Sequence, residues 1–323
     1  MRAVVCTRFD EPESLELQQL DTPGCPSDRV RVHVWASGVN YVDALFVAGK
    51  YQIRPELPFI PGSEVAGEVT EVGADVGGWS IGDRVMASVG LGGFADEVVV
   101  HPAQLLRVPE VLGWGQAATM TQSYATAWFA LTRRTTVSPD EWLVVLGAAG
   151  GVGLATIDVA RALGAKVIAA ASSTERLRVC IERGAHGVVA YGEEPLKERV
   201  RELTGGGADV VVDPVGGELS DAALRSLGEE GRLVVIGFAG GDIPRLPANQ
   251  VLLRNRTVVG VDWGAWAMAH PDDNAELVGE VLAQIDHGVL DPPEPTAYPL
   301  AEAGRALRDL LERRVTGKIC LVS

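Results

Sequence analysis

Residues 142–173 read WLVVLGAAGGVGLATIDVARALGAKVIAAASS, and this stretch decides the fold. It opens with the run 143–146, which is apolar and rich in β-branched residues, as in a strand buried on both faces. A glycine-rich turn follows, and then a segment at 154–163 with apolar residues at helical spacing, which Gly164 ends. A second apolar run at 167–171 predicts another buried strand. Strand, glycine turn, helix and strand in this order indicate a βαβ unit that binds a dinucleotide.

The glycine turn provides the predicted contact with the pyrophosphate of the dinucleotide. Ala148 stands where the usual G-x-G-x-x-G pattern has its first glycine, so the strict pattern fails at one position. Small residues let the backbone approach the phosphates, and the helix start presents free N–H groups and a partial positive charge. We expect these contacts from Ala149, Gly150, Gly151 and Val152. The alternative is a glycine-rich βα turn that binds no ligand.

The end of the second strand predicts which dinucleotide binds. Sites that prefer NAD(H) have an acidic residue about 20 residues after the first glycine, where it binds the ribose hydroxyls. This sequence has Ser172, Ser173 and Thr174 in that region, with no acid before Glu175, and Arg176 follows. Hydroxyls and a guanidinium suit a 2′-phosphate, so we predict NADPH, with Ser172, Ser173 and Arg176 as contacts. Capping of the next helix by the hydroxyls, with a solvated arginine, is a compatible interpretation.

Length and composition limit the classes of protein that the chain can form. With 323 residues, of which 47% are hydrophobic, two domains are expected. The net charge of −15 argues against nucleic acid or an anionic membrane as the main partner, and requires an NADPH site to be locally basic. No signal peptide is evident, and no apolar run approaches the about 20 residues that span a membrane. Four scattered cysteines without C-x-x-C spacing fit a reduced, cytoplasmic protein.

The order of strands and helices predicts an α/β protein with two kinds of domain. Residues 1–123 are mostly short strands separated by glycine turns, which indicates a barrel-like β domain. Residues 124–261 alternate strands and helices, which indicates a doubly wound parallel sheet of the Rossmann type with about six strands. Residues 262–323 hold two further helical segments and a last strand, and are expected to return to the first domain.

Motifs spread over nearly the whole chain resemble one known family. They are VNYVDALFVAGKY (39–51), PFIPGSEVAGEV (58–69), GDRV (82–85), GGFADE (92–97), AAGGVG (148–153), VDPVGG (212–217), GRLVVIGFAGG (231–241) and GKI (317–319). In this order and spacing they resemble the zinc-independent quinone oxidoreductases of the medium-chain dehydrogenase/reductase superfamily, the zeta-crystallin-like group. The resemblance implies a GroES-like catalytic domain split around a Rossmann domain, with the active site in the cleft between them. It also implies NADPH as the hydride donor and a homodimer.

The resemblance also predicts the absence of a catalytic metal. Zinc-dependent relatives have a cysteine where this chain has Asn40, and a His-Glu pair where it has Ser63-Glu64. Zinc takes four ligands in a tetrahedron, and the five histidines of the chain form no cluster with ligand spacing. Without a Lewis acid to ionise an alcohol, alcohol oxidation does not fit. Hydride delivery to a quinone, or to the β-carbon of an enone, remains.

The same resemblance places the floor of the active site near residues 40–43. Asn40, Asp43 and Tyr51 are the expected catalytic residues. Asn40 would hydrogen-bond the acceptor carbonyl or the nicotinamide ribose, or instead cap the short helix that follows. Asp43 has a structural alternative, in which it bonds the backbone or an arginine. Tyr51 would gate the cleft or donate a hydrogen bond, with packing at the cleft wall as its alternative.

The remaining cofactor contacts are expected from the bridging helix and from the carboxyl ends of strands. Thr126 matches a threonine that contacts the nicotinamide side in relatives, with ordinary helix packing as its alternative. The resemblance implies that Tyr191 lies against the adenine or its phosphate, with a surface tyrosine as its alternative. Phe238 is expected beside the nicotinamide. Further expected cofactor-binding residues are Val215, Ala239, Asn255 and Trp263. Trp263 and Trp266 either line the acceptor pocket or pack the hinge between the domains or a dimer contact.

Two other functions are compatible with the sequence. An enoyl-thioester reductase acting on an acyl carrier or coenzyme A would need a basic entry groove, for which Arg133-Arg134 is the candidate. A non-catalytic NADPH-binding protein is the alternative from another class. No Ser-His-Asp or Cys-His arrangement and no paired catalytic carboxylates are evident, so the protein is expected to supply position and a dry site.

Overall fold

A computed structural model describes residues 1–323, and the chain divides into two compact units. The first unit comprises Met1–Gln122 and Pro292–Ser323, and the second comprises Ser123–Asp291. The chain therefore returns to the first unit at Pro292, whereas the sequence placed this boundary at residue 262. The difference arises because helices α8 (Trp263–Ala269) and α9 (Pro271–Asp286) belong to the second unit. There, the Trp128 indole N–H donates to Glu280 at 2.7 Å.

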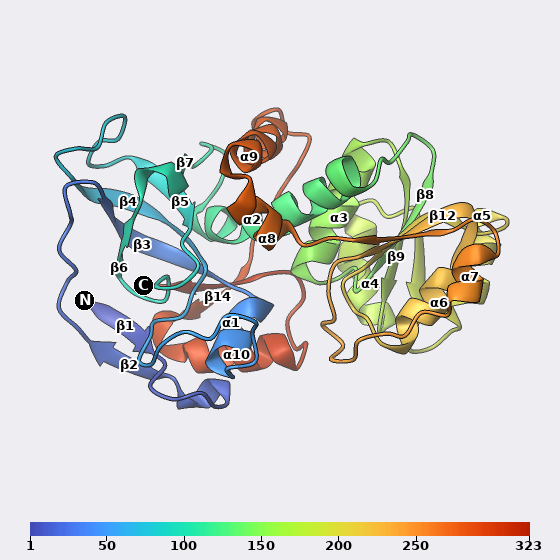
Figure 1. Cartoon of the computed structure of the whole chain (residues 1–323), viewed down its shortest axis with the longest axis horizontal. Helices are drawn as coiled ribbons and strands as arrows, with labels where there is room; N and C mark the ends of the chain where they lie inside the picture. The colour runs from blue at the N-terminus through green and yellow to red at the C-terminus, as the bar shows by residue number, and fades with distance from the viewer. The chain divides into compact units, whose positions relative to one another are not determined.

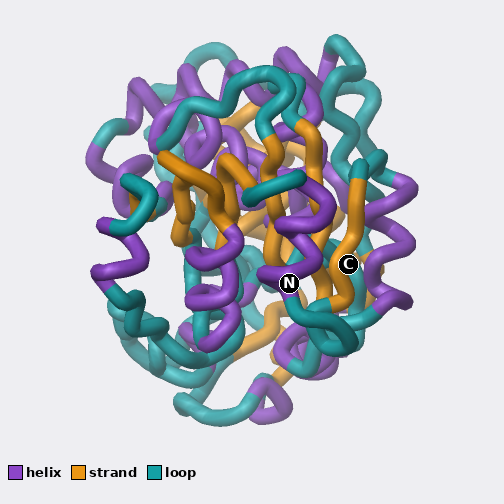
Figure 2. Tube along the Cα trace, turned by 90° about the vertical axis from the view of Figure 1, so that its right-hand side faces the viewer, coloured by secondary structure: helices purple, strands orange, loops and turns teal.

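The second unit is built on a six-stranded parallel sheet, as the sequence predicted (Figures 1 and 2). The strand order is β10-β9-β8-β11-β12-β13, so the chain runs outward from β8 first to one side and then to the other. The strands are β8 (Trp142–Leu146), β9 (Lys166–Ala171), β10 (Gly187–Ala190), β11 (Ala208–Asp213), β12 (Leu227–Val235) and β13 (Thr257–Gly260). In such sheets, ligands bind at the carboxyl ends of the strands, near the reversal of order beside β8.

Helices connect the strands of the parallel sheet and cover both its faces (Figure 2). They are α3 (Gly151–Ala162), α4 (Thr174–Glu182), α5 (Leu196–Thr204), α6 (Glu218–Ser226) and α7 (Ala248–Leu252). The side chains of Leu143–Leu146 in β8 are fully buried, which explains the uninterrupted apolar run in the sequence. Helix α3 begins at Gly151, earlier than the apolar pattern from residue 154 suggested, because its first turn is made by the glycine loop itself.

The first unit contains a seven-stranded sheet and a separate pair of antiparallel strands. The pair is β1 (Arg2–Val5) and β2 (Glu16–Gln19). The sheet has the order β14-β15-β3-β4-β5-β7, with β6 paired to β3. Its strands are β3 (Val30–Val39), β4 (Glu64–Val72), β5 (Arg84–Ser88), β6 (Glu97–Val100), β7 (Leu105–Arg107), β14 (Thr296–Pro299) and β15 (Ile319–Val322). Since β15 pairs with β3, the last strand returns to the first unit as the sequence suggested.

The helices of the first unit are α1 (Tyr41–Val47), α10 (Ala303–Leu311) and the first part of α2 (Trp114–Phe129), which continues into the second unit. Helix α10 contacts α1 and the end of the chain, so residues from both ends of the sequence form one core. Phe46 of α1, Leu307 of α10 and Leu321 of β15 belong to this core. This packing fixes α1 directly beyond the end of β3.

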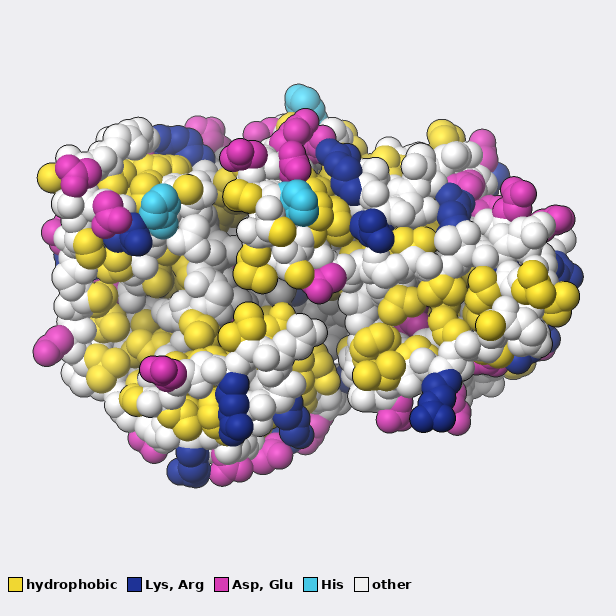
Figure 3. All heavy atoms as spheres, viewed as in Figure 1, with side chains coloured by type: hydrophobic (Ala, Val, Ile, Leu, Met, Phe, Trp, Pro, Cys, Tyr) yellow, Lys and Arg dark blue, Asp and Glu magenta, His cyan; other side chains and the backbone are white.

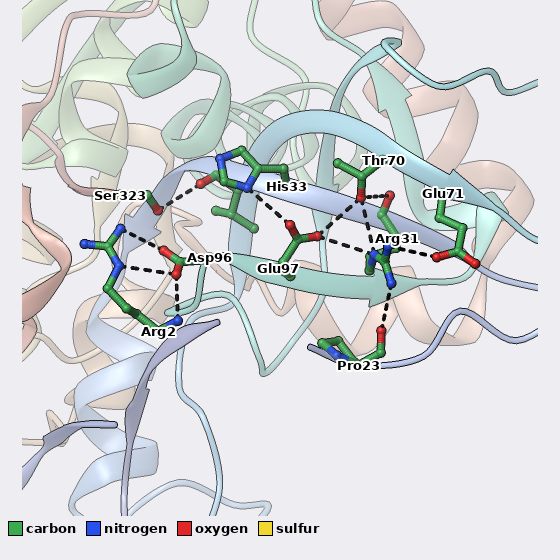
Figure 4. A network of polar contacts seen from close by, with 10 residues as sticks. Arg2, Pro23, Arg31, His33, Thr70, Glu71, Asp96, Glu97 and Ser323 are labelled. Atoms are coloured by element: carbon green, nitrogen blue, oxygen red, sulfur yellow. Dashed lines mark hydrogen bonds and ion pairs between the residues drawn. The ribbon is translucent and has the colours of Figure 1, made fainter. Parts of the chain in front are cut away.

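A polar network on the first unit ties its strands together (Figure 4). Arg31 pairs with Glu71 at 2.8 Å, and Glu97 lies 3.4 Å from the His33 ring. Arg2 pairs with Asp96 at 2.9 Å. Since these charged groups compensate one another between neighbouring strands, the network is structural and does not present a binding site.

Two features of the structure concern membranes and nucleic acids. No helix of the structure is long and apolar enough to cross a bilayer. On the face drawn in Figure 3, Lys and Arg side chains lie scattered among acidic ones and form no continuous basic patch. An extended nucleic-acid footprint would need such a patch.

Candidate active site

The carboxyl edge of the parallel sheet carries the glycine loop. After β8 the chain turns at Gly147, whose φ of +57° is a conformation that favours glycine. Helix α3 then starts at Gly151, so the N–H groups of its first turn lack helical partners and are able to bind an anion. A Cβ at Gly153 would lie 2.5 Å from the Gly147 carbonyl oxygen, so the loop packs directly on the helix. The geometry fits the predicted pyrophosphate contact.

The loops after β11 and β12 form the neighbouring part of this edge. The buried Asp213 carboxylate accepts hydrogen bonds from the Val215 and Gly216 N–H groups at 2.8 and 2.9 Å. The Ala239 N–H donates to the Pro214 carbonyl at 3.0 Å, which joins the two loops. A Cβ at Gly147 would lie 3.0 Å from Val215, so this valine borders the glycine loop. Val215, Phe238 and Ala239 therefore lie at the edge where the sequence expected them.

The loops after β9 and β10 hold the residues predicted to select NADPH. Ser172, Ser173 and Arg176 are half-buried, and the Tyr191 N–H donates to the Ala171 carbonyl at 2.9 Å. The Arg176 guanidinium makes no hydrogen bond or ion pair within the protein, so its charge is available to a ligand.

The prediction of cofactor contacts from the sequence left out one acidic residue near this edge, Glu193. The Glu193 carboxylate accepts hydrogen bonds from the Thr174 N–H at 3.3 Å and from the Thr174 hydroxyl at 3.0 Å. It therefore occupies the start of α4, beside Ser173. Its signal in the sequence is that Glu193 follows β10 at the same edge, outside the region after β9 in which an acid was expected.

The placement of Asn255 differs from the prediction. Asn255 is exposed and comes before β13, and β13 runs parallel to β12. It therefore lies at the amino edge of the sheet, opposite the glycine loop, and does not join the other predicted cofactor residues. The prediction fails because strand β13 lies between Asn255 and the carboxyl edge. At about 3.3 Å per residue, this strand separates them by about 13 Å.

Three other predicted residues take part in packing within the second unit. The Trp263 indole N–H donates to Asn274 at 2.9 Å, which fixes the start of α8 to α9. Trp266 packs on Phe129 with ring centroids 4.6 Å apart. The Thr126 side chain is buried in α2. The helix packing given as the alternative for Thr126 is thus visible in the structure. Trp263 and Trp266 pack on residues of the second unit, and contact of these three residues with a cofactor or an acceptor stays a prediction.

A second polar cluster lies in the first unit, where three strands meet. Strand β3 ends at Val39, β4 begins at Glu64, and their register pairs Gly38 with Glu64. Strand β15 pairs Ile319 with Val39, which brings Lys318 beside Asn40. The strand ends thus collect Asn40, Ser63, Glu64 and Lys318, and we call these four residues the Asn40 cluster.

Every polar atom of the Asn40 carboxamide has a partner in this cluster. Its Nδ2 donates to Glu64 Oε2 at 2.8 Å and to the Ser63 hydroxyl at 3.3 Å. Its Oδ1 accepts a hydrogen bond from Lys318 Nζ. Lys318 Nζ also lies 3.6 Å from Glu64 Oε2, and Glu64 Oε1 accepts from the Gln122 N–H at 2.7 Å. A buried ammonium and a buried carboxylate therefore hold the amide in one orientation.

Asp43 and Tyr51 lie on the α1 side of this cluster. Asp43 is fully buried, and its Oδ2 accepts from the Asn40 backbone N–H at 2.7 Å, as in a capping box. Burial, together with the charge of Glu64, raises the pKa of the Asp43 carboxyl to about 7. Tyr51 packs edge-on against Phe46 with centroids 4.7 Å apart, and its hydroxyl makes no hydrogen bond. The structure thus joins Asp43 to Asn40 and shows the packing alternative for Tyr51.

The residues of the Asn40 cluster do not suit zinc. No group of three or more His, Cys, Asp or Glu side chains is placed to hold a metal ion. Zinc needs about four such ligands. The amide oxygen and the carboxylate that face the centre of the cluster already share the Lys318 ammonium. A metal ion there would have to displace or repel this cation.

The chain combines a parallel, dinucleotide-binding sheet with a preceding β unit that contains both ends of the chain. This is the architecture of the medium-chain dehydrogenases and reductases. Comparisons with known proteins agree. Residues 26–110 match the alcohol dehydrogenase GroES-like domain, and residues 151–281 match the family described as zinc-binding dehydrogenase. The first of these matches confirms the GroES-like part of the predicted fold class.

Similar proteins extend over the whole chain. The quinone oxidoreductase-like protein 2 homolog of Nematostella vectensis is 39% identical over 99% of this chain and 88% of its own length. The quinone oxidoreductase of Mus musculus is 32% identical over 100% of this chain and 98% of its own. The quinone oxidoreductase of Thermus thermophilus, whose crystal structures include its complex with NADPH, is 36% identical with a TM-score of 0.86, each chain being fully covered. The chain belongs to the quinone oxidoreductases of the medium-chain dehydrogenase/reductase superfamily, which confirms the resemblance found in the sequence.

The sequence missed two members of the Asn40 cluster as site residues. Glu64 was noted only as the neighbour of Ser63, and Lys318 only as part of the terminal GKI motif. Both are charged and nearly fully buried, with exposed fractions of 3% and 9%. Charged side chains are rarely buried without a specific partner. A lysine between Gly317 and an apolar last strand was the available signal.

Proposed function

We propose that this protein is an NADPH-dependent reductase that transfers hydride to a quinone or an α,β-unsaturated carbonyl without a metal ion. The observation that supports it most is the glycine loop at the start of α3, with an unpaired Arg176 at the same edge of the sheet. The Thermus thermophilus relative, crystallised with NADPH, supports the choice of cofactor. NADPH, when bound, supplies the hydride. The protein residues bind and orient the reactants.

The Asn40 cluster limits how the acceptor is held. Because both Nδ2 hydrogens and the Oδ1 of Asn40 are already bonded, this residue has no free donor for an acceptor carbonyl. We therefore assign Asn40 the role of holding Ser63, Glu64 and Lys318 in place. Ser63 is half-buried, so we expect its hydroxyl to be the group of the cluster that an acceptor oxygen reaches.

The function is tested by measuring NADPH oxidation with 1,4- and 1,2-quinones, with 2-enones and with crotonyl-CoA. We expect turnover with a quinone or an enone, at a rate that a chelator does not reduce. Loss of activity with a chelator and its return with zinc would contradict the metal-free proposal. Retention of NADPH without turnover of any acceptor would instead indicate the non-catalytic binding protein.

The structure offers no support for the enoyl-thioester alternative. Its candidate entry residues are already engaged, since Arg133 pairs with Glu280 at 2.6 Å and Arg134 donates to the Gly260 carbonyl at 2.9 Å. A faster rate with crotonyl-CoA than with any quinone would restore this alternative.

Replacing Arg176 with alanine is expected to weaken NADPH binding and to leave NADH binding unchanged. The guanidinium is expected to bond the 2′-phosphate, which only NADPH carries. A hydrogen bond between charged groups contributes about 1.5–3 kcal/mol, so the Kd for NADPH should rise about 10- to 100-fold. Arg178→Ala, an exposed residue of the same helix, is the matched control. Equal changes in both Kd values, measured by fluorescence titration, would show that Arg176 does not select the phosphate.

A homodimer and a cytoplasmic location complete the proposal. Strand β13 ends the parallel sheet with Thr257, Val258 and Gly260 exposed, and the nearby Leu252 is 77% exposed. An open strand edge beside apolar side chains supports pairing with a second copy of the chain. The four cysteines are free, as in a reducing compartment. A monomer mass in sedimentation equilibrium would contradict the dimer.

A further inference from the structure

The turn after β10 lies directly against the segment that leads from β9 into α4. The Tyr191 N–H donates to the Ala171 carbonyl at 2.9 Å, which joins the ends of the two strands. A Cβ at Gly192 would collide with the Ser172 carbonyl oxygen, so the two loops are in contact at this glycine. Glu193 is the next residue of the chain. Its backbone is therefore held beside the start of α4.

The Glu193 side chain occupies the first turn of this helix. One carboxylate oxygen accepts from the Thr174 N–H at 3.3 Å, and the other accepts from the Thr174 hydroxyl at 3.0 Å. Ser173 precedes the helix, but its side chain makes no capping hydrogen bond. A carboxylate from 19 positions further along the chain thus takes the place of the usual N-terminal cap.

Arg176 does not neutralise this carboxylate. Arg176 belongs to the same first turn of α4, yet its guanidinium makes no ion pair with Glu193. Glu175, the other charged residue of the turn, is exposed and accepts no hydrogen bond from it. The guanidinium of Arg176 and the carboxylate of Glu193 therefore act separately, and with opposite sign, on a ligand at the start of α4.

The ribose of the adenosine is expected at this place. In a sheet of this type the ribose lies beyond the end of the second strand, which is β9 here. A 2′-phosphate there would use the hydroxyl and N–H donors of the first turn of α4 together with the Arg176 guanidinium. Glu193 already holds two of these donors, both from Thr174, and its charge has the same sign as that of the phosphate. Binding of NADPH must therefore displace a carboxylate.

We propose that Glu193 is a specificity-determining residue, which weakens NADPH binding by competing with the 2′-phosphate for the start of α4. This inference rests on the proposed function and deepens it, because Arg176 favours the phosphate and Glu193 opposes it. With NADH, the carboxylate is instead able to accept a hydrogen bond from a ribose hydroxyl, as an acidic residue does in sites for NAD(H). The preference of this chain for NADPH is thus smaller than Arg176 alone would produce.

The size of the effect follows from the charges. Removing one negative charge a few ångströms from a doubly charged phosphate at the protein surface should lower the Kd for NADPH about 10-fold. Glu193 and Thr174 are both exposed, so salt screens this repulsion and the gain should shrink as ionic strength rises. An effect of Glu193 on the shape of the turn alone would not depend on salt.

The test compares ligands that differ by the 2′-phosphate alone. Glu193→Gln removes the charge and keeps an oxygen that accepts from the Thr174 N–H. In this variant we expect the Kd for NADPH and for 2′,5′-ADP, which lacks the nicotinamide, to fall about 10-fold at low salt. The Kd for NADH and for AMP should change little. Glu193→Lys should bind 2′,5′-ADP more tightly still. Fluorescence titration of the reduced cofactors and calorimetry of the other two ligands give these constants.

The matched control is Glu182→Gln. Glu182 is exposed at the other end of α4, so this variant changes the net charge equally and should bind all four ligands as the wild type does. Three results would overturn the inference: an unchanged Kd for 2′,5′-ADP in Glu193→Gln, an equal gain for AMP, or a gain that persists in about 0.5 M salt. NADPH binding by the wild type would leave the proposed function intact in each of these cases. If neither the wild type nor Glu193→Gln bound NADPH or 2′,5′-ADP, the proposed function would fail, and this inference with it.

Discussion

Gly153→Ala should nearly abolish NADPH binding and lower the free energy of unfolding by about 2–3 kcal/mol, at the upper part of the range for overpacking. The added Cβ would lie 2.5 Å from the Gly147 carbonyl oxygen and 2.6 Å from that of Ala148. Both are backbone atoms, so no side-chain rotation relieves the clash. The helix α3 and the turn after β8 must separate, which moves the N–H groups that are expected to bind the pyrophosphate.

The matched control is Gly279→Ala. Gly279 lies in α9, is exposed, and a Cβ there would meet no atom within 4 Å. Alanine stabilises a helix interior by roughly 0.5–1 kcal/mol relative to glycine, so this variant should gain slightly in stability and bind NADPH normally. Urea denaturation and NADPH fluorescence titration measure both effects. Wild-type affinity in Gly153→Ala would show that the glycine loop does not form the cofactor site.

The sequence predicted the parallel sheet well because each of its signals is local. The buried run in β8, the glycines that follow it and the helical spacing of α3 lie within one segment, and their physical causes act over a few residues. The position of the site at the carboxyl edge then follows from topology alone. For this reason Ala149, Val215 and Tyr191 lie at the edge where they were expected.

The Asn40 cluster could not be predicted in the same way. Lys318 and Asn40 are 278 positions apart, and their contact depends on the register of β15 against β3. Shifting a strand by one residue moves each side chain to the other face of the sheet, so a motif does not specify such a contact. Asn255 shows a different error, because a residue that precedes a strand of a parallel sheet lies at its amino edge, and the prediction did not apply this rule.

Lys318→Met should produce the largest loss of stability in the first unit, about 3–5 kcal/mol, as for a buried ion pair broken by removal of one partner. Lys318 is 9% exposed and supplies the only cation beside Glu64, which is 3% exposed. Methionine is similar in length and apolar, so the loss would not come from a cavity. It would leave a buried carboxylate without its counter-charge, and the Asn40 Oδ1 without its donor. The exposed pair Lys197–Glu198 provides the control, since Lys197→Met should change stability by less than about 1 kcal/mol.

The double variant Lys318→Met with Glu64→Gln separates charge from packing. The glutamine side chain that replaces Glu64 would be neutral, and rotation of the Asn40 carboxamide by 180° would turn its oxygen toward the new amide N–H, so no charge would remain buried. We expect the double variant to recover more than half of the stability lost in Lys318→Met, which requires the two substitutions to be strongly coupled. Additive losses, measured by urea denaturation of all four proteins in the cycle, would mean that Lys318 stabilises the unit by packing alone. Recovery would show that the Asn40 cluster is held by its internal cation, which is also the reason that a divalent metal ion does not fit there.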